Sequence, residues 1–160
     1  NLIEAKKYVI YKDRKKIDLG FVGAPCELNS ILLKRLLSLN IVPVIAPIGA
    51  NKKGIRYNIN ADITAGFISY KIRARRLLML TDVKGVVDKN NVLINELKLK
   101  DIRKLISSGV IYGGMIPKVN TCIQAVEKGV RASVIINGKV KHAILRELFS
   151  SKGVGTLFRK

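Results

Sequence analysis

The 160-residue sequence is poor in cysteine, histidine and tryptophan, which narrows the chemistry open to it. Its two cysteines and one histidine form no Cys–His cluster, which argues against a disulfide scaffold and a structural zinc site. The histidine, His142, has no serine or cysteine nucleophile in a recognisable arrangement, which argues against a catalytic triad. Apolar runs such as residues 41–48 are far shorter than a bilayer-spanning segment, so we expect no membrane-embedded protein.

Acidic residues are also scarce, because 11 Asp and Glu stand against 30 Lys and Arg, a formal net charge of +19. Such a surplus attracts anions. The basic residues are spread along the chain, clusters such as 12–16 carry no interleaved aromatics, and only 6% of residues are aromatic, which leaves few platforms for base stacking. We therefore favour a small anionic substrate, and a basic nucleic-acid-binding module is the non-enzymatic alternative.

Strand-like and helix-like segments alternate along the chain, which predicts an α/β three-layer sandwich with a mostly parallel central sheet. The run at 41–48 is rich in β-branched residues and is expected to be a buried strand. No linker or repeat is visible, so we expect one domain. The expected strands are 8–11, 17–22, 41–48, 55–59, 76–80, 131–136 and 154–158, and the expected helices are 27–39, 61–74, 100–108, 115–128 and 141–149.

Two amides and a carboxylate gather where the helix at 61–74 is expected to begin. These are Asn58, Asn60 and Asp62. The backbone N–H groups at a helix N-terminus favour anions, so the segment is a candidate binding site. Plain capping, with Asn60 as the N-cap and Asp62 as a partner of the helix dipole, is an equal alternative.

Two further loops combine glycine with a polar or charged side chain. Thr81, Asp82 and Gly85 follow a buried strand, where ligands bind in open parallel sheets, although an ordinary β-turn is the favoured explanation of these residues taken by themselves. The two glycines at 113–114 lead into a helix that carries Lys118 one turn after its start. Such a loop and lysine are a plausible phosphate cradle, although the residue spacing is not that of a Walker A loop. A solvated surface lysine is the alternative there. The loops together indicate an anionic ligand at one edge of the sheet.

The segments 57–62, 80–86 and 113–119 occur in the order and spacing found in N-acetylglutamate kinases of the amino-acid kinase family. With similar stretches at 19–23 and 142–156, the chain resembles the carboxy-terminal half of this family over essentially its whole length. The resemblance implies ATP and Mg²⁺ as cofactors and phosphorylation of the side-chain carboxylate of N-acetyl-L-glutamate, a step of arginine biosynthesis. Another amino-acid kinase with a different acceptor is the alternative within enzymes.

The resemblance also implies a role for individual residues. Lys118 would stabilise the transferring phosphoryl group, and Asp62 would orient the catalytic lysines. Asn58 and Asn60 would bind acetylglutamate, and no side chain is assigned as a metal ligand. The residues matching the nucleotide-binding edge are Thr81, Asp82, Val83, Gly85, Val87, Ile111, Tyr112, Gly114 and Met115.

A regulatory site and several partners follow from the same resemblance. Arginine-inhibited members bind arginine through a closing segment that His142, Glu147, Gly153 and Gly155 match, although a helix surface and a C-terminal turn explain these residues equally well. The family further implies a homo-oligomer when full length and a nitrogen-signalling regulatory protein as a partner. The cytoplasm is the expected location, with the plastid stroma as the alternative.

Residues 1–160 would form the nucleotide-binding half of the kinase, and the amino-terminal substrate half would be absent. That half supplies a second lysine, glycine-rich loops and an arginine that grips the substrate. The chain opens at Asn1 without an initiator methionine, so we expect a piece of a longer protein. This piece alone is expected not to phosphorylate acetylglutamate.

Overall fold

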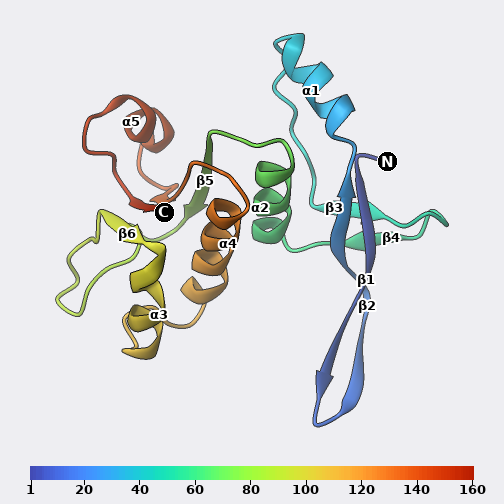
Figure 1. The fold of residues 1–160 in the computed structure, drawn as a ribbon, viewed down its shortest axis with the longest axis horizontal. Helices are drawn as coiled ribbons and strands as arrows, with labels where there is room; N and C mark the ends of the chain where they lie inside the picture. The colour runs from blue at the N-terminus through green and yellow to red at the C-terminus, as the bar shows by residue number, and fades with distance from the viewer. The chain divides into compact units, whose positions relative to one another are not determined.

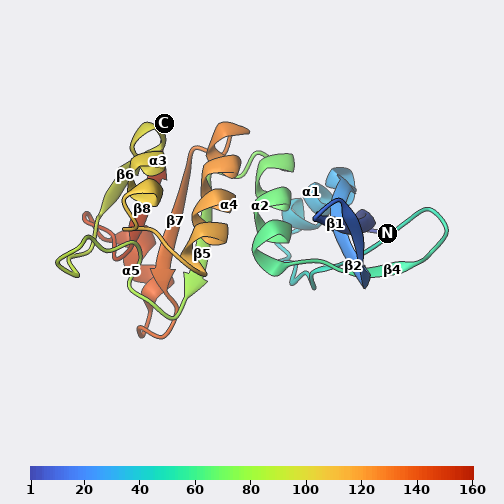
Figure 2. The ribbon, with the colours of Figure 1, turned by 90° about the horizontal axis from the view of Figure 1, so that it is seen from below.

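The computed structural model describes all 160 residues, which form two compact units, Asn1–Ile72 (unit 1) and Arg73–Lys160 (unit 2). Each unit is built on its own strands and helices (Figures 1 and 2). The sequence carries no Pro- or Gly-rich stretch at this boundary, so composition gives no sign of the division. Neither unit contains a helix of the length and apolar character needed to cross a bilayer.

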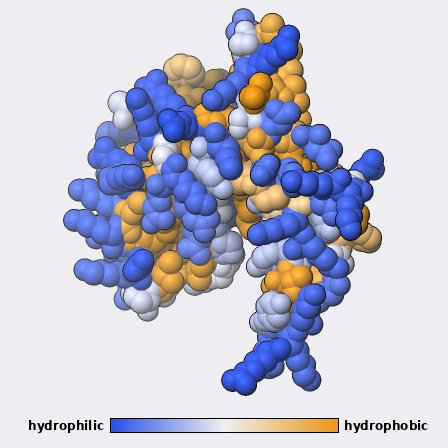
Figure 3. Space-filling model, turned by 45° about the vertical axis from the view of Figure 1, so that its right-hand side comes forward, coloured by the Kyte–Doolittle hydropathy of each residue, from blue (hydrophilic) through white to orange (hydrophobic).

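Unit 1 begins with a long antiparallel hairpin of β1 (Ile3–Lys12) and β2 (Lys15–Leu28). Asp13 and Arg14 make the turn with φ values of 50° and 61°, as the two-residue turns of twisted hairpins require. Hydrophilic side chains cover the hairpin tip (Figure 3). The expected strands at 8–11 and 17–22 are confirmed, but they are only the distal part of longer strands.

The hairpin is joined by the short antiparallel strands β3 (Ile48–Ala50) and β4 (Arg56–Asn58), and β4 confirms the expected strand at 55–59. β3 runs parallel to β1 and β4 runs parallel to β2, so the four strands close in the order β1-β2-β4-β3. The expectation of a mostly parallel sheet is therefore wrong for unit 1. Its core contains Ile3, Ala5, Tyr57 and Ile59.

The helices of unit 1 are α1 (Ser30–Ser38) and α2 (Ala61–Lys71), and both were expected. Each begins after an asparagine whose side-chain oxygen accepts a backbone N–H, as N-caps do. Asn29 accepts from Leu32 at 3.0 Å, and Asn60 accepts from Ile63 at 3.1 Å. The caps fix where the two helices start.

The expected buried strand at 41–48 is wrong. Residues 41–46 form no strand, and the side chains of Val42 and Val44 are 86% and 97% exposed. Hydrophobic residues, drawn in orange, gather on the surface at the α1 end of unit 1 (Figure 3). An apolar, β-branched run forms a buried strand only where neighbouring strands supply hydrogen bonds and both faces are covered. In this chain pairing starts only at Ile48.

Unit 2 contains a four-stranded sheet in the order β5-β7-β8-β6. Its strands are β5 (Arg76–Thr81), β6 (Glu96–Lys98), β7 (Ala132–Asn137) and β8 (Thr156–Arg159). β5 is parallel to β7 and β6 is parallel to β8, whereas β7 and β8 are antiparallel. The three expected strands of this unit are confirmed, and the sheet is mixed because the pair of β7 and β8 is antiparallel while the other two pairs are parallel.

The helices of unit 2 are α3 (Leu99–Ser107), α4 (Met115–Glu127) and α5 (Ala143–Phe149), as expected. Ser133 of β7 donates its hydroxyl hydrogen to the Cys122 carbonyl of α4 at 3.2 Å, so this side of the strand faces α4 (Figure 2). The alternate residues Val134 and Ile136 pack against Ala143 of α5. Side chains alternate across a strand, so helices cover both faces of β7.

Candidate functional site

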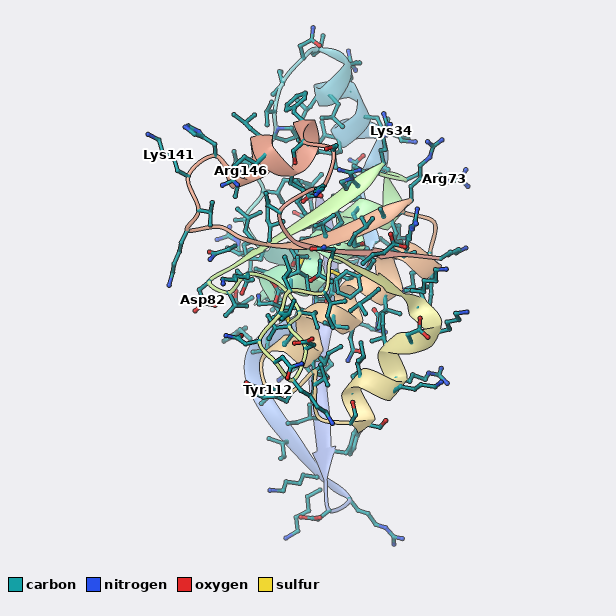
Figure 4. All side chains as sticks on the ribbon, turned by 90° about the vertical axis from the view of Figure 1, so that its left-hand side faces the viewer. Lys34, Arg73, Asp82, Tyr112, Lys141 and Arg146 are labelled. Carbon is teal, nitrogen blue, oxygen red and sulfur yellow. The ribbon has the colours of Figure 1, made fainter.

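A cavity of about 690 Å³ opens in unit 2 where β5 and β7 end. Thr81 and Asn137, the last residues of these parallel neighbours, are register partners and both line it. Ligands of open α/β sheets bind outside the carboxyl ends of the strands. Asp82 and Tyr112 lie toward the same edge of the unit (Figure 4). The cavity thus occupies the position at which a ligand is expected.

One wall is the segment that leaves β5, residues 81–87 (the 81–87 segment). The segment begins with two polar residues, and the Thr81 hydroxyl donates a hydrogen bond to an Asp82 carboxylate oxygen at 3.3 Å. Gly85 follows with a φ of 141°, which L side chains rarely adopt. The wall therefore offers a hydroxyl, a carboxylate and a backbone without a side chain.

The opposite wall is the start of α4 and the residues before it. Gly113 has a φ of 54°, and Gly114 occupies the N-cap position with no side-chain cap. Lys118 lies in the first turns of α4, is partly buried and lines the cavity. A helix N-terminus and an ammonium group both favour negative charge, so this wall suits a phosphate.

The structure brings Lys118 and all but one of the expected nucleotide-binding residues around this cavity. The exception is Ile111, which is 1% exposed and belongs to the core. Asn137 could have been found in the sequence, because it ends an expected strand just as Thr81 does. The lining residues that sequence reasoning missed are Asn91 and Asn137, whereas Lys84, Val86, Val110 and Gly113 lie within or directly beside the segments that it singled out.

The expected substrate residues belong to unit 1. Asn58 ends β4 and is exposed. Asn60 caps α2, so one of its two alternative roles is present in the fold. Asp62 lies in the first turn of α2, as expected of a partner of the helix dipole. Binding of acetylglutamate by the two amides, and convergence of Asp62 with Lys118, stay predictions.

The expected arginine-binding residues lie in α5 and in the segments before and after it. Glu147 is 7% exposed, accepts the Val154 N–H at 2.8 Å and lies 3.8 Å from the Arg76 guanidinium. Gly153, with φ 65°, leaves room for this carboxylate, because a Cβ there would lie 2.8 Å from it. Gly155 is buried, whereas His142 is exposed just before α5. These contacts give Glu147 a structural role, and arginine binding stays a prediction.

No group of three or more His, Cys, Asp or Glu side chains in the 160 residues is placed to hold a metal ion. Asp82 is the one carboxylate on the cavity wall. Mg²⁺ prefers few protein carboxylates together with phosphate and water oxygens. The donor set therefore fits a magnesium ion that arrives with a polyphosphate.

Comparison with known proteins decides the family. The sequence model of the amino acid kinase family matches residues 3–137. The chain belongs to the amino acid kinase family. Among solved members of this fold, N-acetylglutamate synthase from Neisseria gonorrhoeae superimposes with a TM-score of 0.91 at 22% identity, over all of this chain and 37% of that one.

Curated relatives of this member of the amino acid kinase family are more similar to it in sequence than that solved structure is. Acetylglutamate kinase of Bradyrhizobium sp. strain BTAi1 is 52% identical over 146 residues, which cover 91% of this chain and 49% of the relative. Acetylglutamate kinase of Rhodopseudomonas palustris strain TIE-1 is 54% identical over 144 residues, covering 90% and 48% respectively. The chain thus spans about half the length of the curated relatives it matches.

Proposed function

We propose that these residues are the nucleotide-binding part of an ATP-dependent acetylglutamate kinase, which phosphorylates the side-chain carboxylate of N-acetyl-L-glutamate. The cavity carries the proposal, because it joins the 81–87 segment, the double glycine and Lys118 at one edge of the sheet. Relatives more than half identical to the chain are acetylglutamate kinases.

The chemistry of this reaction suits the residues present. A side-chain carboxylate has an ordinary pKa of about 4.3, so the nucleophile is already ionised at neutral pH and needs no general base. The difficulty is to bring one anion up to another, and catalysis therefore rests on positioning and charge stabilisation. Lys118 and the N-terminus of α4 supply positive charge on the cavity wall.

Magnesium belongs to the proposal as the cation that would accompany the phosphates of ATP. When bound, it neutralises part of the charge on the phosphate oxygens. Asp82 is the residue of this chain that would hold it, directly or through water. Thr81 fixes the orientation of that carboxylate through its hydroxyl.

The test compares two lysine variants of the full-length protein. Lys118→Met removes the cation on the cavity wall, and Lys104→Met removes an exposed lysine of α3 as the matched control. Trapping the acyl phosphate with hydroxylamine measures turnover. We expect kcat to fall about 10²- to 10³-fold for Lys118→Met, as for removal of one preorganised charge-stabilising donor. We expect wild-type turnover for Lys104→Met.

Two results would contradict the proposal. Normal turnover by Lys118→Met would remove this lysine from the reaction. A wild-type protein that ignores acetylglutamate but phosphorylates another carboxylate would favour a kinase with a different acceptor.

A further inference from the structure

Thr156 is a buried hydroxyl residue that the nucleotide site described above does not include. It opens β8, opposite Ile135 of β7, and is 0% exposed. Its hydroxyl oxygen accepts the Val86 N–H at 2.9 Å and donates its hydrogen toward the Val86 carbonyl at 3.4 Å. A hydroxyl has one donor and two acceptor sites, so it can serve both groups of one peptide residue.

The partner of this hydroxyl is part of the cavity wall. Val86 and its neighbours Gly85 and Val87 all line the cavity. Val86 is 2% exposed, so its N–H has no access to bulk water. A buried N–H that loses its acceptor costs the full desolvation of that group. The Thr156 hydroxyl therefore fixes the carboxyl end of the 81–87 segment.

Two glycines make this close approach possible. A Cβ on Gly85 would lie 2.6 Å from the Thr156 hydroxyl oxygen, closer than real Cβ contacts allow. A Cβ on Gly155 would collide with the Ile135 backbone of β7. The absence of side chains at both positions lets β8 lie against β7 while the 81–87 segment folds over Thr156. The two glycines therefore provide the space that the contact of Thr156 with Val86 requires.

We propose that Thr156 is a positioning residue for nucleotide binding: its hydroxyl holds the 81–87 segment in the shape that receives ATP, so the last strand of the chain sets the affinity. This inference rests on the proposed function. Thr156 acts through the backbone of Val86 and not through the reacting atoms. Lys118 is carried by α4, so the loss of the hydroxyl affects ATP binding more than the chemical step.

The experiment replaces the hydroxyl in the full-length protein and separates binding from turnover. Thr156→Val keeps the shape and removes both hydrogen bonds, whereas Thr156→Ser keeps them. Ser133→Ala is the matched control, because it removes another fully buried hydroxyl, which lies near the start of β7 and away from the end of the strand that lines the cavity. The readouts are the ATP dissociation constant, KM for ATP, kcat, and the exchange rate of the Val86 amide hydrogen.

For Thr156→Val we expect an ATP dissociation constant and KM raised about tenfold, which corresponds to about 1.4 kcal/mol. The Val86 amide should exchange faster in this variant, and kcat should change less than KM. We expect the ATP dissociation constants of Thr156→Ser and Ser133→Ala to stay within about threefold of the wild-type value.

Wild-type ATP affinity in Thr156→Val would overturn the inference while leaving the proposed function intact. A wild-type protein that binds no ATP would overturn both. If Thr156→Val does not fold, Thr156→Cys decides, because a thiol is a weaker hydrogen-bonding group than a hydroxyl. The inference requires Thr156→Cys to bind ATP more weakly than Thr156→Ser, and equal affinity would overturn it.

Discussion

Replacing Gly85 by alanine places a methyl group where unit 2 has no room for one. The new Cβ would lie 2.6 Å from the Thr156 hydroxyl oxygen and 2.9 Å from Leu93 Cδ1. The residue would also keep a φ of 141°, a strain of about 1–3 kcal/mol for an L side chain. Overpacking adds about 1–3 kcal/mol, so the full cost is about 2–6 kcal/mol if the segment stays in place.

The free energy of unfolding of the full-length Gly85→Ala variant should therefore be lower than that of wild type by at least about 2 kcal/mol. The variant should accordingly unfold at a lower urea concentration. If the segment moves instead to relieve the clash, ATP affinity falls while stability recovers. Gly114→Ala is the matched control for stability, because its φ is −66° and nothing lies within 4 Å of the new Cβ, so it should unfold like wild type. Wild-type stability together with wild-type ATP affinity in Gly85→Ala would show that the site accommodates the methyl group without strain or movement.

Two further predictions concern unit 1. The Lys7 ammonium donates to Asp18 at 2.6 Å, with the Gly20 N–H as a second donor, and lowers the pKa of that carboxyl from its ordinary 3.8. Lys7→Met should raise the pKa of Asp18 toward 3.8 in an NMR titration, and an unchanged pKa would contradict the ion pair. Because the pKa of Asp18 is lowered in the folded protein, the ion pair stabilises the fold above pH 3.8, and this contribution is lost as the pH falls through the pKa of the folded state. Asn60→Ala removes the cap of α2 and should lower the free energy of unfolding, measured in urea, by about 1 kcal/mol. Asn60→Ser should retain most of the stability that the cap provides, and an equal loss in both variants would argue against capping.

The helices could be predicted from the sequence because local signals mark their ends. Asn60 caps α2, and Gly109 and Gly129, both with positive φ, follow α3 and α4. These signals depend on neighbouring residues alone, so no knowledge of the tertiary fold is needed. The cavity was predictable for a related reason, since β5 and β7 are parallel neighbours and their carboxyl ends meet.

Strand pairing was harder to predict because it depends on distant partners. The three-residue strand β6 is too short to show a pattern, and it exists because β8 lies beside it. The apolar run at 41–48 has the composition of a buried strand but lacks the partners that would make it one. The contact of Thr156 with Val86 joins residues 70 apart, and nothing in the local sequence indicates it.

The proposed function requires ATP to bind in the cavity between the 81–87 segment and the start of α4. Hydrogen–deuterium exchange of the full-length protein with and without ATP and Mg²⁺ tests it most directly. We expect slower exchange on ATP addition in residues 81–87 and 110–115, all of which except Ile111 line this cavity, and no change at the tip of the hairpin of β1 and β2. Unchanged exchange at the cavity, with protection of the basic hairpin tip by DNA instead, would contradict it.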